Sequence, residues 1–233
     1  MTGWTKDATL DAMRGRLVVS CQAYPGEPMR DPRTMAQVAA AVVAGGAAAV
    51  RAQGIDDIQA IARTVDVPVV GLWKDGDDPV FITPTLDHAV AVARAGAHVV
   101  ALDGTRRPRP DGRTLAQTVA GLREAVGDIT VMADCGSLED ARQAEAAGVD
   151  LLGTTLAGYT GERPTTEGPD LDLLDEIVAA CRLPVVVEGR VRTPDHVADA
   201  LARGAFGVCV GTAVTHPTSI ARWFVAATES RRA

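Results

Sequence analysis

The sequence predicts a TIM (β/α)8 barrel, an α/β fold formed here by a single domain over residues 1–233. Apolar runs rich in valine and leucine alternate with stretches of helical periodicity along the chain. Each run lacks the polar alternation of a sheet with one wet face, which is typical of a parallel sheet buried on both sides. Eight such pairs fit the length of a compact barrel, and no G-x-G-x-x-G motif follows the first run, as a doubly wound dinucleotide-binding sheet would show.

The elements follow one another in regular order. We expect a short helix within residues 1–15 that closes the floor of the barrel, because Leu10 and Met13 lie one helical turn apart. The glycines that end the helices recur at intervals of about fifty residues and supply left-handed caps before the next strand; they are Gly46, Gly96, Gly148 and Gly204. The expected strands are 16–22, 47–53, 68–74, 98–103, 129–134, 151–155, 184–189 and 207–212, with helices such as 34–44, 85–95, 138–147 and 194–204 between them.

Composition narrows the classes of partner. The net charge is −7, and no stretch gathers basic residues among aromatic ones, so we expect no nucleic-acid partner. No signal peptide begins the chain and no apolar run approaches the roughly 20 residues that span a bilayer, so we expect no membrane partner and a cytoplasmic location. The four cysteines are far apart and the four histidines are scattered, which predicts reduced, buried thiols and no metal site.

Lysine is rare in this chain. The 23 Lys+Arg residues include only Lys6 and Lys74, so the other 21 are arginines. An ammonium can lose its proton on burial, whereas a guanidinium stays charged. A biased codon supply would also make lysine rare, so the place of Lys74 in the fold decides whether it has a functional role. Lys74 closes the third expected strand, where a neutral amine would be useful to catalysis.

Polar residues close almost every expected strand. In a TIM barrel the carboxyl ends of the strands build the active site, so these side chains should meet at one mouth. Any one of them alone is as consistent with a solvated strand end. Together they mix two basic, three acidic and two neutral groups, which indicates a site; in order they are Gln22, Arg51, Lys74, Asp103, Asp134, Thr154 and Glu188.

The last two strands carry a phosphate signal. Gly189 and Gly211 directly follow strands seven and eight, where TIM barrels often bind a phosphate with backbone N–H groups and a helix N-terminus. We expect the cradle to be Gly189, Arg190, Gly211 and Thr212. Turns between strands and helices are also glycine-rich for conformational reasons, so each pair alone is a weak signal. The joint placement predicts a phosphate site.

A small sugar phosphate suits an anion-binding end beside an interior lysine and glutamate. Desolvation and the charge of Arg51 would both lower the pKa of Lys74 and make it a general base. Glu188, across the mouth, would donate to or polarise a carbonyl. A proton next to a carbonyl becomes acidic when the enolate oxygen is stabilised, so this chemistry requires no metal or organic cofactor.

Several motifs together carry a specific resemblance. They are "LVVSCQAYPGEP", "AAAVRAQG", "FITPT", "VVALDGTRRPRP", "ADCGS", "LLGTTLAGYT", "VVVEGRVRTPDHVADALARGA" and "VCVGTAVTHP", and they span nearly the whole chain. In these the sequence resembles the N-acylglucosamine-6-phosphate 2-epimerases, also called N-acetylmannosamine-6-phosphate 2-epimerases, of bacterial sialic acid catabolism. The resemblance implies a TIM barrel that interconverts N-acetyl-D-mannosamine 6-phosphate and N-acetyl-D-glucosamine 6-phosphate without a cofactor.

The resemblance also implies roles for individual residues. Lys74 matches the lysine that removes the C2 proton of the open-chain sugar, and Glu188 matches the acid or polariser at the C1 oxygen. Positions that hold the sugar or its phosphate fall on Gln22, Arg51, Asp134, Arg190 and the Gly211-Thr212 turn. One residue departs from the family pattern: Asp75 follows Lys74, where an arginine is usual. A carboxylate facing Lys74 would favour the charged ammonium.

Other functions and features stay open at this point. Lys74 would equally suit a Schiff-base lyase or aldolase, because an amine with a lowered pKa attacks carbonyls. A barrel that binds a sugar phosphate without turning it over would keep the same cradle. Residues 156–169 are rich in glycine, proline and threonine, which is typical of an active-site lid and of a merely mobile loop. The apolar outer helices allow a homodimer.

Overall fold

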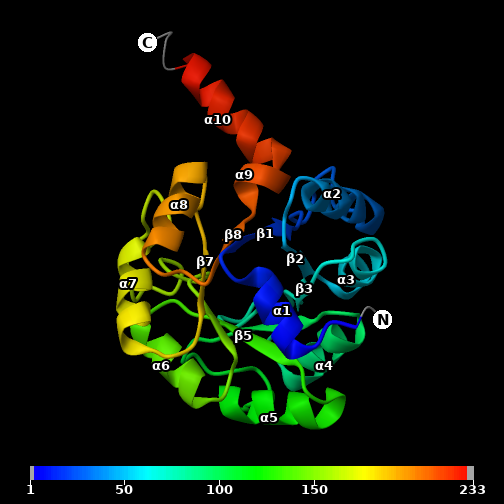
Figure 1. Cartoon of the computed structure of the whole chain (residues 1–233), viewed down its shortest axis with the longest axis vertical. Helices are drawn as coiled ribbons and strands as arrows, with labels where there is room; N and C mark the ends of the chain where they lie inside the picture. The colour runs from blue at the N-terminus through cyan, green and yellow to red at the C-terminus, as the bar shows by residue number, and fades with distance from the viewer. Residues whose placement is uncertain (1–2, 230–233) are drawn as a thin grey trace.

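The chain folds into a closed barrel of eight parallel strands with helices between them (Figure 1). The structure is a computed structural model that describes residues 3–229, so residues 1–2 and 230–233 of the predicted domain lie outside the described residues. Strands adjacent in the sequence are adjacent in the sheet, and β8 pairs with β1 to close the barrel. The predicted TIM barrel is confirmed; its strands are β1 (Arg16–Cys21), β2 (Ala49–Gln53), β3 (Val69–Leu72), β4 (Val99–Asp103), β5 (Thr130–Asp134), β6 (Leu151–Gly153), β7 (Val185–Glu188) and β8 (Gly207–Val210).

Polar side chains cap the start of most helices, and glycines follow the ends of several. Thr85 and Ser137 each accept a hydrogen bond from the backbone N–H three residues later, and such a cap stabilises a helix by about 1 kcal/mol. The four glycines predicted at helix ends all have φ between 83° and 111°, as expected. The helices are α1 (Lys6–Met13), α2 (Pro32–Ala44), α3 (Ile55–Ala62), α4 (Leu86–Arg94), α5 (Leu115–Val126), α6 (Leu138–Ala146), α7 (Leu171–Ala180), α8 (Pro194–Ala202), α9 (Thr212–Thr215) and α10 (Pro217–Glu229).

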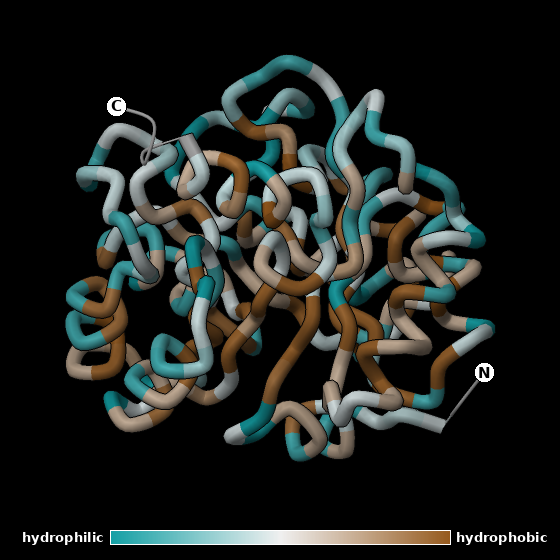
Figure 2. The backbone as a smooth tube through the Cα atoms, turned by 90° about the horizontal axis from the view of Figure 1, so that it is seen from above, coloured by the Kyte–Doolittle hydropathy of each residue, from teal (hydrophilic) through white to brown (hydrophobic). Residues whose placement is uncertain are grey.

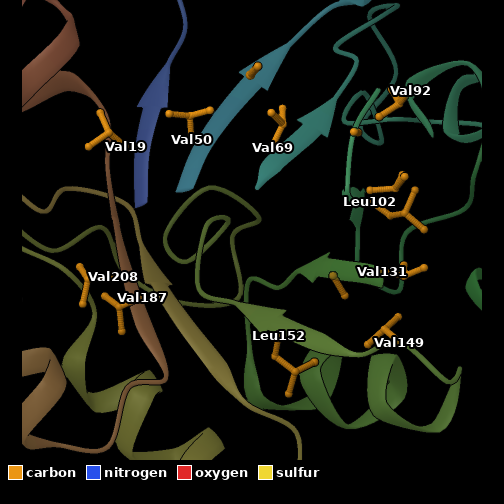
Figure 3. Packing of buried hydrophobic residues seen from close by; sticks show 14 of the residues in the cluster. Val19, Val50, Val69, Val92, Leu102, Val131, Val149, Leu152, Val187 and Val208 are labelled. Carbon is orange, nitrogen blue, oxygen red and sulfur yellow. The ribbon is translucent and has the colours of Figure 1, made fainter. Parts of the chain in front are cut away.

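Strand side chains alternate between two hydrophobic clusters. Val19 and Val50 belong to the outer cluster between the strands and the helices, together with Val92 of α4 (Figure 3). Val18 and Ala49, one residue earlier on the same strands, belong to the inner cluster that fills the barrel. Because side chains alternate with a period of two, the same pattern decides which polar residues enter the mouth of the barrel.

Helices α1 and α10 differ in how they meet the barrel. Met13, the last residue of α1, is fully buried in the inner cluster with Phe206, and the N–H of Gly15 donates to the carbonyl of Phe206 over 2.7 Å. At the other end α10 projects away from the barrel (Figure 1) and exposes Trp223, Phe224 and Val225 by 38%, 73% and 53%.

Hydropathy follows this architecture. Apolar residues run along the strands through the middle of the molecule, and many hydrophilic residues lie in the surrounding loops (Figure 2). Within residues 3–229, no helix combines the length and the apolar character that crossing a membrane requires.

Candidate active site

A cavity of about 660 Å³ opens at the carboxyl ends of the strands. The inward positions of the strands lead to it: on β3, Val70 and Leu72 fill the barrel and Lys74 follows at the next inward position. Four of the seven strand-closing side chains, those of Gln22, Arg51, Lys74 and Glu188, therefore meet at one mouth, as the sequence predicts. The predicted site residues that line the cavity are Gln22, Arg51, Lys74, Glu188, Gly189, Arg190, Gly211 and Thr212.

Arg51 forms the charged centre of the site. It lies only 2% exposed on β2, with Nη2 2.5 Å and Nη1 3.1 Å from the two carboxylate oxygens of Asp134. Nη1 is also 2.9 Å from Oε2 of Glu188. Burial alone would lower the pKa of Arg51, but the charges of Asp134 and Glu188 outweigh it and raise this pKa above its ordinary value. One cation thus holds two carboxylates at the bottom of the cavity.

Asp134 lies behind Arg51 and away from the cavity surface. It is fully buried and is not among the lining residues. Gly153 makes this arrangement possible, because a Cβ there would lie 2.5 Å from the Met132 methyl group and 3.3 Å from Oδ1 of Asp134. Asp134 therefore orients Arg51 in this structure, and its predicted contact with the substrate stays a prediction.

Glu188 presents a carboxylate to the cavity from the end of β7. Its Oε2 is buried and has no hydrogen-bond partner, although it lies 2.9 Å from the Arg51 guanidinium. Desolvation raises the pKa of Glu188 above its usual range; Arg51 opposes this shift and Asp134 adds to it. A carboxyl group held toward its neutral form, with an oxygen that makes no hydrogen bond, suits a proton donor.

Lys74 reaches the cavity from the segment just beyond β3. Nζ lies 3.0 Å from Oε1 of Gln22, whose amide nitrogen donates to Ser20 Oγ over 2.8 Å. Solvent enters through the open mouth, yet the surrounding protein desolvates the ammonium. Desolvation, followed by the positive charge of Arg51, lowers the pKa of Lys74, while Glu188 and Asp134 partly oppose this shift. Lys74 and Glu188 are thus both displaced toward their neutral forms.

Asp75, the departure from the family pattern, turns away from the site. Its Oδ2 lies 3.1 Å from Nε2 of His88 on α4, and its charge is not among those that shift the pKa of Lys74. Asp77 and Asp78 are exposed. No three His, Cys, Asp or Glu side chains within residues 3–229 are grouped to hold a metal ion. Asp75 therefore leaves the pKa of Lys74 undisturbed.

The predicted orientation of Thr154 toward the mouth is wrong. Thr154 Oγ1 accepts from the N–H of Glu188 over 3.1 Å and donates to the carbonyl of the same residue over 2.9 Å. It shares the outward direction of Leu152, whereas Thr155 shares the inward direction of Leu151 and donates to Asp134 over 2.6 Å. A shift of one residue moves a side chain to the other face of a strand. β6 ends at Gly153, before either threonine, so the sequence pattern of the strand does not fix which of them faces inward.

Asp103, another strand-closing residue, is also withdrawn from the cavity. It is fully buried, accepts hydrogen bonds from the N–H and hydroxyl of Thr105, and pairs with Arg107 at 2.8 Å. These contacts stabilise the loop after β4. Arg107 itself lines the cavity, a role that the sequence pattern did not reveal.

The turns after β7 and β8 form the other end of the cavity. Gly189 and Arg190 have φ values of 103° and 56°, and Gly211 caps α9. The guanidinium of Arg190 donates to Gly168 O and Thr166 Oγ1 at 3.2 and 3.1 Å, which ties it to the loop 156–169. Its Nη1 is buried without a hydrogen-bond partner. A cationic donor and a glycine backbone thus face the same end.

Two further residues line the mouth of the cavity and were not predicted from the sequence. Tyr24 lines the cavity with its ring centroid 5.8 Å from Lys74 Nζ and meets the ring of His216 edge-on at 4.9 Å. His216 is buried, with Nε2 2.5 Å from a carboxylate oxygen of Glu27. These contacts join the loop after β1 to the start of α10. Glu27 and His216 lie 189 positions apart in the sequence, and no local sequence pattern indicates such a contact.

Comparisons with known proteins agree with this geometry. A family described as "Putative N-acetylmannosamine-6-phosphate epimerase" matches residues 35–230. The chain is 58% identical over 226 residues to "Putative N-acetylmannosamine-6-phosphate 2-epimerase" of Cutibacterium acnes, covering 96% of this chain and 98% of that protein. It is 46% identical over 218 residues to a protein of the same name from Corynebacterium glutamicum strain R, covering 91% and 92%.

A solved structure is similar over its full length. It is described as the N-acetylmannosamine-6-phosphate 2-epimerase from Clostridium perfringens. It matches with a TM-score of 0.92 and 35% sequence identity, covering 97% of this chain and 99% of that one. The likeness thus extends from the sequence to the arrangement of the whole barrel.

Proposed function

Because the chain belongs to the family of N-acetylmannosamine-6-phosphate 2-epimerases, we propose that it interconverts N-acetyl-D-mannosamine 6-phosphate and N-acetyl-D-glucosamine 6-phosphate. It would be an isomerase of amino sugar and sialic acid degradation. The observation that carries the proposal is the pairing of Lys74 and Glu188 around Arg51, in which burial displaces both ionisable groups toward their neutral forms. This is the combination that proton transfer next to a carbonyl requires.

The proposed mechanism moves protons only. In the open-chain sugar, the neutral amine of Lys74 takes the proton from C2, and the electron pair of the C2–H bond forms a C1=C2 double bond. Protonated Glu188 donates to the C1 oxygen, beside the positive charge of Arg51. Return of the proton from that oxygen to Glu188, and delivery of the proton on the Lys74 ammonium to the opposite face of C2 once the enol turns that face toward it, gives the epimer and restores the neutral amine. No oxidation state changes, so no redox cofactor takes part.

The rest of the cavity would fix the substrate. Gly189, Arg190, Gly211 and Thr212 would hold the phosphate, with the unpartnered Nη1 of Arg190 available to its oxygens. Gln22 would orient Lys74 and contact the sugar, as its amide already bridges Ser20 and the amine. Phosphate at one end and the base at the other would place C2 rather than another carbon at Lys74.

Substitution of the base tests the proposal. Lys74→Met retains the length and apolar stem of the side chain and removes the amine, so turnover should fall by about 10²–10⁴-fold or more. Binding of the substrate, measured by calorimetry, should largely survive. Lys6→Met is the matched control, because Lys6 is the first residue of α1, pairs with Asp150 at 2.5 Å and does not line the cavity. Turnover retained in Lys74→Met would refute this role.

Two further experiments separate the alternative functions. A Schiff-base lyase or aldolase would leave a reduced adduct on Lys74 when borohydride is added with substrate, and mass spectrometry would detect the added mass. The proposed epimerase forms no such adduct. A barrel that only senses the sugar phosphate would bind it in calorimetry without any exchange of the C2 proton.

We also propose that the protein forms a homodimer. The support is the projecting helix α10, on which Trp223, Phe224 and Val225 are exposed. Large exposed apolar side chains grouped on one element are typical of a contact surface. Sedimentation or light scattering should give twice the mass of the chain, and Phe224→Glu should lower it. A monomeric wild-type protein would exclude the dimer.

A further inference from the structure

The proposed base does not lie on a strand of the barrel. β3 ends at Leu72, and Lys74 is held by a short antiparallel ribbon formed by residues 73–75 and 81–83. Lys74 pairs with Ile82 in this ribbon. The N–H of Asp75 donates to the Phe81 carbonyl over 3.0 Å, outside the parallel sheet. The position of the amine therefore depends on what fixes this ribbon.

Thr83 fixes the ribbon to the barrel. It is fully buried, its N–H donates to the Trp73 carbonyl over 2.7 Å, and its hydroxyl accepts from the Trp73 N–H over 3.1 Å. The same hydroxyl donates to the carbonyl of Ala101 on β4 over 2.7 Å. Its φ is 48°, a left-handed conformation that costs free energy for a β-branched residue and persists only where the surroundings enforce it.

Arg109 enforces that conformation from the loop after β4. It is 7% exposed, and its Nη1 donates to the carbonyls of Thr83 and Pro84 at 3.4 and 3.3 Å. Its Nη2 donates to the carbonyl of Asp103 at the end of β4. A buried guanidinium that satisfies three main-chain carbonyls clamps the turn against the strand. The motifs "FITPT" and "TRRPRP" thus meet where Arg109 contacts Thr83. Neither Thr83 nor Arg109 lines the cavity.

The outer side of the ribbon is also held. Trp73 and Asp75, on either side of Lys74, both contact His88 of α4: the Trp73 and His88 ring centroids are 4.5 Å apart, and Asp75 lies 3.1 Å from His88 Nε2. His88 Nδ1 lies 2.6 Å from Thr85 Oγ1. With residues 73 and 75 turned outward, Lys74 must face the cavity, because side chains alternate along an extended segment.

We propose that Thr83 and Arg109 are positioning residues, which place the amine of Lys74 in the cavity by fixing the ribbon that carries it. This inference rests on the proposed role of Lys74 as the base. A displacement of about 1 Å between reacting groups can lower a rate by about 10²-fold. Loss of either clamp should therefore reduce kcat far more than it changes KM, since neither residue lines the cavity.

The first test uses matched threonine substitutions. Thr83→Val removes the hydroxyl with little change in shape and should lower kcat by about 10–100-fold with KM within about threefold. Thr118→Val is the control, because Thr118 is fully buried on α5 and also donates its hydroxyl to a carbonyl, that of Thr114 over 3.1 Å. It should lower the melting temperature and leave kcat unchanged. Thr83→Ser, which retains the hydroxyl, should recover most of the activity.

A spectroscopic readout separates positioning from mere stability. With only two lysines in the chain, ¹³Cε-labelled lysine gives two NMR signals, and a Lys6→Arg variant assigns them. In Thr83→Val the Lys74 signal should shift and its titration midpoint should rise toward that of free lysine, whereas Thr118→Val should leave both unchanged. Arg109→Gln is the second variant and should behave like Thr83→Val, so failure of one variant to fold leaves the test intact.

The outcomes are distinct. Unchanged kcat and an unchanged Lys74 signal in folded Thr83→Val or Arg109→Gln would overturn the positioning role. An equal loss of kcat in Thr118→Val would also overturn it, because the effect would then follow from stability alone. Absence of epimerisation by the wild-type protein would refute the proposed function instead, while the Lys74 signal would still report whether Thr83 and Arg109 place the amine.

Discussion

Removing the charge of Arg51 should destabilise the protein in a way that depends on pH. Arg51→Met keeps an unbranched side chain but leaves Asp134 and Glu188 buried without their shared cation. Breaking a buried ion pair by removing one partner costs about 3–5 kcal/mol. In a chain of 150–250 residues each kcal/mol corresponds to about 2–4 °C, so the melting temperature should fall by about 6–20 °C.

The pH dependence identifies the cause. In the native protein desolvation already raises the pKa of Glu188, and Arg51 opposes that rise. Without Arg51 the folded pKa rises further above the unfolded value, so the stability deficit is smallest below the ordinary glutamate pKa of about 4.3 and grows as pH increases through the folded pKa. Thermal melts followed by circular dichroism between pH 4 and pH 8 would measure this trend.

Two controls make the result decisive. Arg142→Met removes an exposed cation 3.6 Å from Glu139 and should change the free energy of unfolding by no more than about 1 kcal/mol. Adding Asp134→Asn to Arg51→Met should recover part of the loss, because one of the unpaired carboxylates is then neutral. A melting temperature lowered equally at every pH, with no recovery in the double variant, would refute the proposed role of charge.

Three other predictions concern the mouth of the barrel. In a lysine NMR titration Lys74 should lose its proton at a lower pH than free lysine, about 10.4, because desolvation and Arg51 lower its pKa; a midpoint at or above that value would contradict the base assignment. Asp75→Asn should leave kcat within about threefold of the wild-type value, since the carboxylate faces His88. A larger rise in kcat would show that the charge of Asp75 keeps Lys74 protonated. Gly189→Ala adds a side chain where φ is 103° and should raise KM about tenfold, equivalent to about 1.4 kcal/mol; unchanged kinetics would exclude Gly189 from the phosphate site.

Much of the fold follows from periodicity alone. The strands are mostly apolar runs, because helices cover the outside of the barrel and side chains fill its interior; the charged Arg51 within β2 is an exception. The turns back to the sheet could be located from glycines such as Gly96 and Gly148, which adopt the predicted left-handed conformation. The residues that line the mouth, Glu188 at the end of β7 and Lys74 two residues beyond β3 among them, could be assigned to it for the same reason.

What the sequence did not reveal depends on register and on loop geometry. β6 has only three residues and ends at Gly153, so its pattern does not extend to the two threonines that follow, and Thr155 rather than Thr154 faces inward. The contact of His216 with Glu27 and that of Arg109 with Thr83 join separate loops. No local periodicity reports such contacts, because each depends on the path of two loops at once.

The central claim is that this barrel transfers a proton at C2, and proton NMR in D2O tests it most directly. The purified protein is mixed with N-acetylmannosamine 6-phosphate, and the C2 proton and the signals of the gluco epimer are followed together. We predict that deuterium enters C2 as the epimer forms and that Lys74→Met abolishes both changes. An unchanged spectrum from a protein that binds the sugar phosphate in calorimetry would contradict the claim, as would epimer formed without deuterium at C2.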